Sequence, residues 1–471
     1  LSIRRQRQMC IRDRVKEGSG TLTLTGANGY TGGTQLNAGG LTGNTGSLQG
    51  NVATAAGTTL TFNQNTNGTY GGNLSGAGNL EKAGTGTVTL DGANTLTGAI
   101  GVAQGTLRAG GGAINTASGV RIDSGATLAL TSAASIASLT GAGTLQSGSA
   151  LTLGNGSDSI FGGVLAGTGS TTKVGTGTLT LAGANTQSGV FDINGGRVNL
   201  TGSLGSSTVN VNGAGSSLAG TGIASGNVFI KNGGNLYVSS ANTGGLTLGS
   251  LSVDGASSIN ADLGAPYSGS LINVNGNVTL NGSINVTQLP GFGVGVYRIV
   301  SYQGTGMTTG LTLANASPTF SLQTGLAGQI NVLNQSQANE IQIWQGSSGT
   351  WNGTNANWAN ATTLAAEAWG GRFGVFQGPV STVTVDATSN LQFQGLQFST
   401  DGYIVSGGTL TAVNGSDGVT TLRVEPNVTA TLGSTLAGTD VTLAKRDAGT
   451  LILTGANTYT CLLYTSDAAD E

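Results

Sequence analysis

The stretch Lys173–Gly183 reads KVGTGTLTLAG, and its pattern recurs three more times along the chain. The other copies are Lys16–Gly26 (KEGSGTLTLTG), Lys82–Gly92 (KAGTGTVTLDG) and Lys445–Gly455 (KRDAGTLILTG). Each copy continues with an Ala-Asn pair, ending at Asn28, Asn94, Asn185 and Asn457. The spacing between successive copies is unequal and is widest before the last one. The pattern is therefore a recurring unit rather than an array of fixed period.

Within each copy, aliphatic residues alternate with threonine. The aliphatic pairs are Leu22/Leu24, Val88/Leu90, Leu179/Leu181 and Leu451/Leu453. A period of two places these pairs on one face of a strand and threonine on the other. The following Gly-Ala-Asn is turn chemistry, because glycine and asparagine tolerate positive φ.

A second and a third extended piece follow the turn. In the second piece we expect Leu36, the pair Ile100/Val102 and the pair Phe191/Ile193 to point inward. Three copies share a glycine at one fixed distance beyond the repeat, and an aliphatic residue stands two positions later: Gly39/Leu41, Gly105/Leu107 and Gly196/Val198. Three short strands per unit, joined by tight turns, predict a coil wound around an apolar axis.

Other stretches follow the same pattern: Gly57–Phe62, Gly125–Leu130 and Val278–Val286. The best candidate for an amphipathic helix is Ala359–Ala368, and it is weak, which argues against an α/β fold. Strand spacing leaves a sandwich or barrel open. We favour an all-β fold, a right-handed parallel β-helix forming an elongated rod. At about 20 residues per coil, the chain would make roughly 22 coils.

Composition excludes several classes of function. The chain has 85 glycines among 471 residues, no histidine, 8% charged residues and a net charge of −3. Catalysis or metal binding by imidazole is therefore impossible. Seventeen basic residues spread over this length also argue against a nucleic-acid partner.

Both ends differ in character from the rest. One set of synonymous codons for Cys461–Glu471 gives a reverse complement that encodes RRQRQMCIRD, which is Arg4–Asp13. That DNA resembles a sequencing adapter. We therefore interpret 1–14 and 461–471 as adapter translation and expect neither to pack onto the fold. Both cysteines, Cys10 and Cys461, lie in these ends, so no disulfide is expected between them.

Composition shifts divide the remainder. We expect β-helix repeats over 15–250, a β-rich continuation over 251–340, a Trp- and Phe-containing β segment over 341–435, and the start of a further repeat over 436–460. All four tryptophans lie between Trp344 and Trp369. We interpret them as packed core, with a carbohydrate-binding platform as the alternative.

No catalytic, cofactor-binding or metal-ligating residue is assigned, and no cofactor is expected. The acids are scattered, among them Asp91, Asp123, Asp158, Asp192, Asp254 and Asp262. Stacked coils bring distant residues together, so a carboxylate pair suited to glycoside hydrolysis stays open. Asn155–Asp158 and Asn414–Gly418 lack the ligand spacing of calcium loops and are interpreted as turns.

The units Lys16–Thr34, Lys82–Ile100, Lys173–Val190 and Lys445–Thr460 resemble the autotransporter-associated β-strand repeat, K-x-G-x-G-T-L-T-L-x-G-A-N-x-Y-T-G-G-T. Leu96 and Gln187 stand where tyrosine is usual, and Arg446-Asp447-Ala448 precedes Gly449 in the last unit. Trp344–Tyr403 resembles a segment found between such repeats.

This resemblance implies a β-helical passenger region of type V secretion in a Gram-negative bacterium. It would be displayed at the cell surface, attached to the outer membrane through a C-terminal β-barrel outside this sequence. We expect a non-enzymatic, structural and adhesive rod that contacts glycans, host or neighbouring cells, or identical rods. The alternatives are a β-helical polysaccharide lyase or hydrolase, and a stalk for an effector domain elsewhere.

Overall fold

The computed structural model describes residues 14–242, 244–265, 269–346 and 348–465, with the side chains of 461–465 left undescribed. Nearly all secondary-structure elements of the described residues are β-strands, and these wind into a β-solenoid of about 22 turns. The expected all-β solenoid is therefore confirmed, whereas the right-handed winding and the rod length stay predictions. The chain divides into two compact units, one formed by 1–237 and 246–257 and the other by 238–245 and 258–471.

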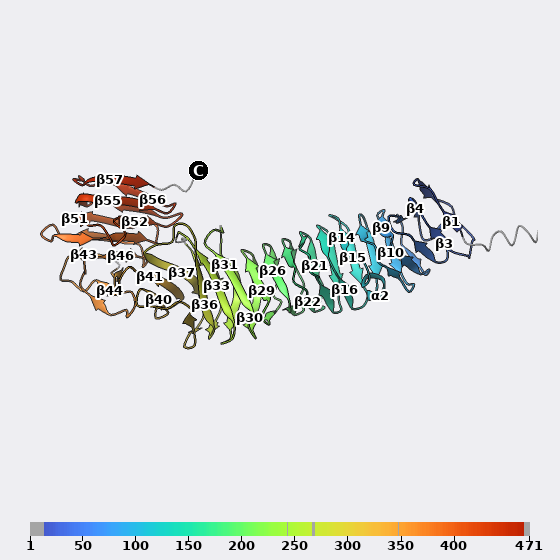
Figure 1. Ribbon diagram of the computed structural model, residues 1–471, viewed down its shortest axis with the longest axis horizontal. Helices are drawn as coiled ribbons and strands as arrows, with labels where there is room; N and C mark the ends of the chain where they lie inside the picture. Colours follow the sequence, from blue (N-terminus) through green and yellow to red (C-terminus); the bar gives the residue numbers. More distant parts are fainter. Residues whose placement is uncertain (1–13, 243, 266–268, 347, 466–471) are drawn as a thin grey trace, which may run out of the picture. The chain divides into compact units, whose positions relative to one another are not determined.

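In unit 1 the strands of successive coils stack in parallel (Figure 1). The longest sheet contains, in order, β2 (Thr21–Thr23), β4 (Gly40–Gly43), β6 (Thr59–Asn63), β9 (Asn79–Ala83), β12 (Ile100–Val102), β14 (Val120–Ile122), β17 (Leu139–Gly141), β20 (Ser159–Phe161), β23 (Thr178–Leu181), β26 (Gly196–Leu200), β29 (Ser216–Gly220) and β31 (Asn235–Ser239).

Further sheets form the other faces of the coils. One contains β1 (Arg14–Lys16), β3 (Thr34–Leu36), β5 (Val52–Thr54), β8 (Leu74–Gly76) and β11 (Thr95–Leu96). Another contains β7 (Gly68–Tyr70), β10 (Thr87–Leu90), β13 (Thr106–Ala109), β15 (Thr127–Leu130), β18 (Thr144–Ser147) and β21 (Val164–Ala166).

A last sheet of unit 1 contains β16 (Ala134–Ile136), β19 (Leu151–Leu153), β22 (Thr171–Lys173), β25 (Phe191–Ile193), β28 (Val209–Asn212), β30 (Ile223–Lys231) and β32 (Leu246–Val253), with β24 (Ala184–Asn185) and β27 (Ser203–Leu204) beside it. A helical turn, α2 (Gly111–Ile114), interrupts one coil.

Unit 2 begins with the stack β33 (Ser258–Leu263), β36 (Ser283–Gln288) and β39 (Thr312–Leu313). Beside it lie β34 (Ile272–Val274), β37 (Gly295–Tyr302), β41 (Gln329–Asn334) and β40 (Phe320–Gln323), together with β35 (Val278–Leu280) and β38 (Gly306–Met307). The pairs β37–β41 and β40–β41 are antiparallel, so antiparallel pairing interrupts the parallel stack.

Three sheets complete unit 2. The first contains β45 (Ala366–Glu367), β44 (Trp358–Asn360), β42 (Ile341–Trp344), β46 (Phe373–Phe376), β49 (Gly395–Phe398), β52 (Thr420–Val424), β55 (Thr439–Arg446) and β57 (Thr460–Thr465). The second contains β43 (Gly349–Trp351), β47 (Thr382–Val385), β50 (Ile404–Gly407), β53 (Thr429–Leu432) and β56 (Thr450–Leu453), and the third β48 (Leu391–Phe393), β51 (Thr409–Ala412) and β54 (Thr435–Ala437). The weak helix candidate Ala359–Ala368 is not helical, because it forms the antiparallel hairpin of β44 and β45.

The core of each coil consists of aliphatic side chains in register with those of its neighbours. Val88 on β10 pairs with Leu107 on β13, which pairs with Leu128 on β15. All three are fully buried. The spacing of these partners along the chain agrees with the expected coil length. The second extended pieces also point inward as expected, since Leu36, Ile100, Val102, Phe191 and Ile193 are buried.

Glycine at the third piece is required by the stacking itself. Gly105 and Gly196 adopt φ of +67° and +63°. A Cβ on Gly105 would lie 2.5 Å from the carbonyl oxygens of Gly84 and Gly86 in the preceding coil. These positions exclude side chains because of both conformation and space.

The inward alternation is confirmed in the two inner repeats and in the last one, where Leu451 and Leu453 pack against a core cluster of unit 2, but it is wrong at Leu22 of the first repeat. Val88, Leu90, Leu179 and Leu181 are buried, whereas Leu22 is 42% exposed. Leu24, Leu451 and Leu453 are only partly buried. The strands β2 and β56 end their sheets, so no described coil covers these side chains from the far side.

The expectation that both ends stay off the fold is also wrong where the structure describes them. Arg14 belongs to β1, and its guanidinium lies 3.7 Å from the centre of the Tyr30 ring. Residues 461–465 continue β57, which pairs in parallel with β55. An edge strand offers backbone donors and acceptors to any sequence, which explains this pairing. Residues 1–13 and 466–471 lie outside the described residues.

Candidate functional site

The lysines that open the two inner repeats lie inside the solenoid, whereas Lys16 and Lys445 are only partly buried. Lys82 is 0% exposed and Lys173 is 1% exposed. Lys82 Nζ donates to the carbonyl oxygens of Ala83 at 2.9 Å, Gly84 at 2.7 Å and Gln104 at 3.0 Å. The first two carbonyls belong to its own corner and the third to the next coil. The lysine therefore ties one coil to the coil that follows it.

The third repeat reproduces this arrangement. Lys173 Nζ donates to Val174, Gly175 and Gly195 at 2.7, 3.1 and 3.1 Å. In the first repeat Lys16 Nζ donates to Glu17, Gly18 and Ala38, and in the fourth Lys445 Nζ donates to Arg446 and Asp447. This role was not predicted from the sequence. The recurrence of a lysine at the first position of every repeat is the feature that could have indicated it.

Burial makes the charged form of these lysines costly. It lowers the pKa of Lys82 from 10.5 to about 8. Burial also lowers the pKa of Lys173, and the charge of Asp158 partly opposes that shift. The carbonyl dipoles satisfy the donors of the Lys82 and Lys173 ammonium groups, so each of these lysines is a structural clamp with a high electrostatic cost.

The asparagine of the last three Gly-Ala-Asn turns ties the same coil to the preceding one, whereas Asn28 of the first donates to Ser47 in the next coil at 2.9 Å. Asn94 and Asn185 are each 3% exposed. Their Oδ1 atoms accept the backbone N–H of Leu74 and Leu165, both at 2.8 Å. Asn185 Nδ2 also donates to Ser203 in the next coil at 2.9 Å. Asn457 Oδ1 likewise accepts the N–H of Leu436 at 2.9 Å.

In the two inner repeats, lysine and asparagine together connect three consecutive coils. Both side chains form hydrogen bonds with backbone groups that the corners would otherwise leave unpaired. In the two inner repeats this arrangement fixes register, and both side chains are shielded from solvent.

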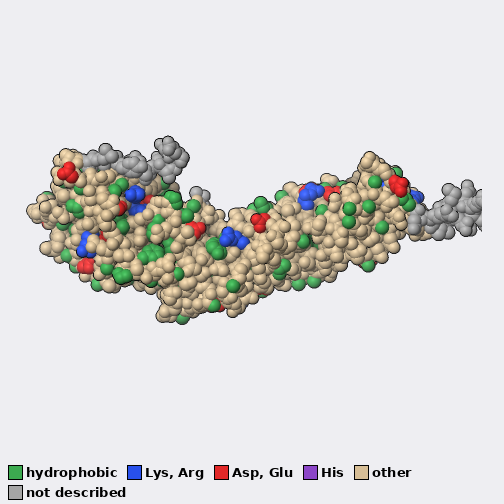
Figure 2. Space-filling view, viewed as in Figure 1, with side chains coloured by type: hydrophobic (Ala, Val, Ile, Leu, Met, Phe, Trp, Pro, Cys, Tyr) green, Lys and Arg blue, Asp and Glu red, His purple; other side chains and the backbone are tan. Residues whose placement is uncertain are grey.

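The acids that sequence analysis singled out are dispersed. Asp91 is exposed, and Asp158 Oδ1 accepts the N–H of Thr178 at 2.6 Å. Asp254 accepts bonds from Asn232, Ala256 and Ser257. Asp262 lies half-buried in β33. Within the described ranges, no three acids or cysteines gather as a metal ion would require. Figure 2 shows charged groups only sparsely on the face in view.

Two acids do share a cation. Arg121 Nη2 lies 2.9 Å from Glu81 Oε1, and its Nη1 also pairs with Asp123. Glu81 on β9 reaches β14 across Gly101 of the intervening strand, where a Cβ would lie 2.0 Å from Glu81 Oε2. The arginine holds both carboxylates as ion-pair partners at the surface.

The two calcium-loop candidates are turns, as expected. Asn155 Oδ1 accepts the N–H of Ser157 at 2.7 Å, which closes the first turn. Asp417 Oδ1 accepts the N–H of Val419, and Gly415 N–H bonds the carbonyl of Val419 at 2.9 Å. Side-chain oxygens of this kind cap their own backbone.

The tryptophans form a buried cluster. Trp351 and Trp358 are 0% exposed, Trp344 is 2% exposed and Trp369 is 8% exposed. Ring centres lie 5.0 Å apart for Trp351 and Trp358, and 4.5 Å apart for Trp358 and Trp369. A carbohydrate platform needs accessible ring faces, so that alternative is wrong and the packed core is confirmed.

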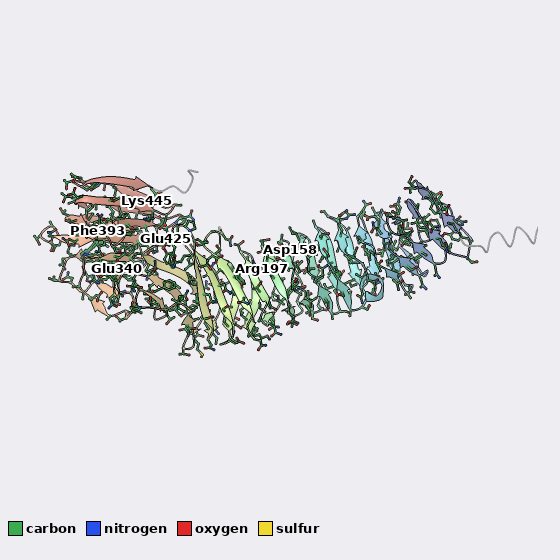
Figure 3. The ribbon with its side chains drawn as sticks, in the orientation of Figure 1. Asp158, Arg197, Glu340, Phe393, Glu425 and Lys445 are labelled. Atoms are coloured by element: carbon green, nitrogen blue, oxygen red, sulfur yellow. The ribbon has the colours of Figure 1, made fainter. Side chains whose placement is uncertain are left out.

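Unit 2 contains a buried ionic network that sequence analysis missed (Figure 3 labels Glu425). Arg423 Nη1 lies 3.1 Å from Asp447 Oδ1, and both side chains are 1% exposed. Glu425 accepts bonds from Gln397 at 2.8 Å and from Ser399. Burial raises the pKa of Glu425 to about 7. The departure from the repeat pattern at Arg446-Asp447-Ala448 could have indicated this network. Asp447 stands there in place of a small residue and forms an ion pair with Arg423.

Comparisons with known proteins agree with this architecture. A family model described as the passenger-associated-transport-repeat matches residues 15–42, 80–109, 172–200 and 443–460. The chain is also 33% identical over 265 residues to the adhesin BmaC autotransporter of Brucella suis biovar 1 (strain 1330), covering 50% of this chain. It spans only 8% of that relative's length.

A repeat-bearing β-solenoid of this kind is an autotransporter passenger region. This particular chain is a passenger region with four passenger-associated transport repeats and a distant similarity to an autotransporter adhesin. Every matched range contains the lysine and the asparagine of one clamp. The first three ranges also include the carbonyl that the lysine reaches in the next coil, at Ala38, Gln104 and Gly195. The described part of the chain has no helix long and apolar enough to cross a membrane.

Proposed function

We propose that this passenger region is a structural and adhesive part of a surface-displayed protein and has no enzymatic activity. An autotransporter passenger is displayed at the cell surface or outside the cell. In our proposal a C-terminal translocator β-barrel of the same protein anchors the chain to the outer membrane, and its partners are glycans, host or neighbouring cell surfaces, or identical chains.

The proposal rests on the direction in which the polar side chains of the coils face. In the two inner repeats the lysine and asparagine face inward and hold coils together. Outward positions are largely threonine, serine and asparagine, which provide many weak hydrogen-bonding contacts. A repeated weak contact becomes strong through multivalency. The similarity to an autotransporter adhesin supports the same function.

The test is surface display. The full chain is placed before an autotransporter barrel on Gram-negative cells, and cells displaying the barrel alone serve as the control. We expect increased attachment to cultured epithelial cells or faster settling through aggregation. Equal attachment and equal settling of the two strains would overturn the adhesive function.

A further inference from the structure

Unit 1 carries an exposed aromatic ring on the outer face of a sheet. Phe229 on β30 is 37% exposed. In the strand register it stands between Asn210 on β28 and Ser252 on β32. Neighbouring strands lie about 4.8 Å apart, so polar side chains border the ring on both sides. A ring in this position offers an accessible apolar face to a ligand.

Beside the ring, three polar side chains are held in a fixed chain. Asn210 Nδ2 donates to Asp192 Oδ1 at 2.8 Å, and Lys231 Nζ donates to Asn210 Oδ1 at 3.0 Å. They come from the successive strands β25, β28 and β30. A carboxylate, an amide and an ammonium thus lie together, and the two opposite charges leave the cluster with no net charge.

A surface hollow adjoins this cluster. Its volume is about 370 Å³, and its lining includes Gly175, Asn194, Gly196, Asn212 and Gly213. Asn194 and Asn212 follow Asp192 and Asn210 by two residues, so they continue the same outer face. Asn212 Nδ2 donates to Asn194 at 3.4 Å, and Asn232 Nδ2 donates to Asn212 at 2.6 Å.

The floor of the hollow is fixed from inside by a repeat lysine. Lys173 donates to the carbonyls of Gly175 and Gly195, which both line the hollow. The corner glycines present backbone without side chains, and the amides at the rim are joined to one another. The hollow is therefore preorganised rather than formed on demand.

We propose that the face formed by Phe229, the Asp192–Asn210–Lys231 cluster and the adjoining hollow binds a neutral oligosaccharide. A pyranose ring presents an apolar C–H face that packs on an aromatic ring, and hydroxyl groups that pair with amide and carboxylate groups. The balanced charge of the cluster favours a neutral ligand over an anionic one. This inference rests on the proposed adhesive function and names the chemistry of its ligand.

The test measures binding of the full chain to chitotetraose, cellotetraose and maltotetraose by isothermal titration calorimetry, with a heparin-derived tetrasaccharide as the anionic comparison. We expect at least one neutral tetrasaccharide to bind. The Phe229→Ala variant should bind it at least about tenfold more weakly. Ile223→Ala is the matched control, because Ile223 lies on the same strand and is 47% exposed. It should leave the affinity unchanged.

Three outcomes would overturn the site: no neutral tetrasaccharide binds at millimolar concentration, only the heparin fragment binds, or both variants lose affinity equally. Circular dichroism of each variant confirms that it is folded. Surface display separates this inference from the proposed function. Cell attachment by a chain that binds no neutral tetrasaccharide would remove the site and keep the adhesive function. Tetrasaccharide binding without any cell attachment or aggregation would remove the adhesive function and keep the site.

Discussion

Lys82 is a cation enclosed by three carbonyl oxygens and shielded from solvent. The same geometry recurs at Lys173, in a coil of different sequence. The carbonyls satisfy the ammonium donors, while burial penalises its charge. Lys82 therefore connects two coils at an electrostatic cost. That cost decreases as the pH rises and the ammonium loses its proton.

The stability of the chain should rise with pH through the titration of Lys82. Its pKa is about 8 when folded and 10.5 in the reference state, so the unfolded chain binds more protons between these values. Unfolding free energy then increases with pH in that window, by at most about 2 kcal/mol from pH 8 to pH 10. The cost of burying the charge is fully present below pH 8.

Urea unfolding at pH 8, 9 and 10 tests this for the wild type and for Lys82→Met, which cannot titrate. The unfolding free energy of the wild type should increase relative to that of Lys82→Met as the pH rises. Measurements stop at pH 10, because burial raises the pKa of Tyr70 above its usual 10 and adds an opposing slope at higher pH. Parallel pH profiles for the two proteins would contradict the prediction.

At the scale of one strand, alternation decides which residue tolerates charge. Leu181 on β23 is 0% exposed, whereas Thr180 beside it is half-buried and faces outward. The register places Leu181 between Phe161 and Leu200, both fully buried, so it lies within a continuous apolar stack. The edges of the solenoid behave differently, because Leu22 has the same pattern without a covering strand.

Leu181→Asp should destabilise unit 1 by about 4 kcal/mol or more, because it places an unpaired carboxyl group in the core. Thr180→Asp is the control on the neighbouring position and should cost about 1 kcal/mol or less. The midpoint of urea unfolding measured by circular dichroism compares the two. Equal shifts for both variants would contradict the assigned alternation.

At the scale of the whole molecule, the chain forms two compact units. Stacked coils couple mainly to their nearest neighbours, so damage in one place spreads over a limited distance. All four tryptophans belong to unit 2. Tryptophan emission therefore reports on unit 2 alone, whereas far-ultraviolet circular dichroism reports on the strands of both units.

We expect Leu181→Asp, which lies in unit 1, to separate these two signals. Part of the circular dichroism change should move to lower urea concentration, while the midpoint of the tryptophan emission change stays where it is in the wild type. Thr180→Asp should leave both signals coincident. If the emission midpoint of Leu181→Asp moves together with its circular dichroism, the two units unfold as one and the prediction fails.

Much of the fold was determined by local sequence. Short patterns each specify a piece of backbone: the alternation in TLTL, the glycine at position 105 and the Gly-Ala-Asn turn. They can do so because strand period and positive φ are local properties. Repetition of these pieces is enough to predict a solenoid and the approximate length of its coils. The inward direction of Ile100 and Phe191 followed from the same local rule.

Only the tertiary structure decided what the polar residues do. Lys82 and Asn94 become clamps because a neighbouring coil brings a carbonyl or an N–H to them, and sequence does not contain that distance. Arg423 and Asp447 meet through stacking of distant segments in the same way. Phe229 stands beside Asn210 through strand register. Period and turn chemistry act within a few residues, whereas contacts between coils depend on how many residues each loop adds before the chain returns.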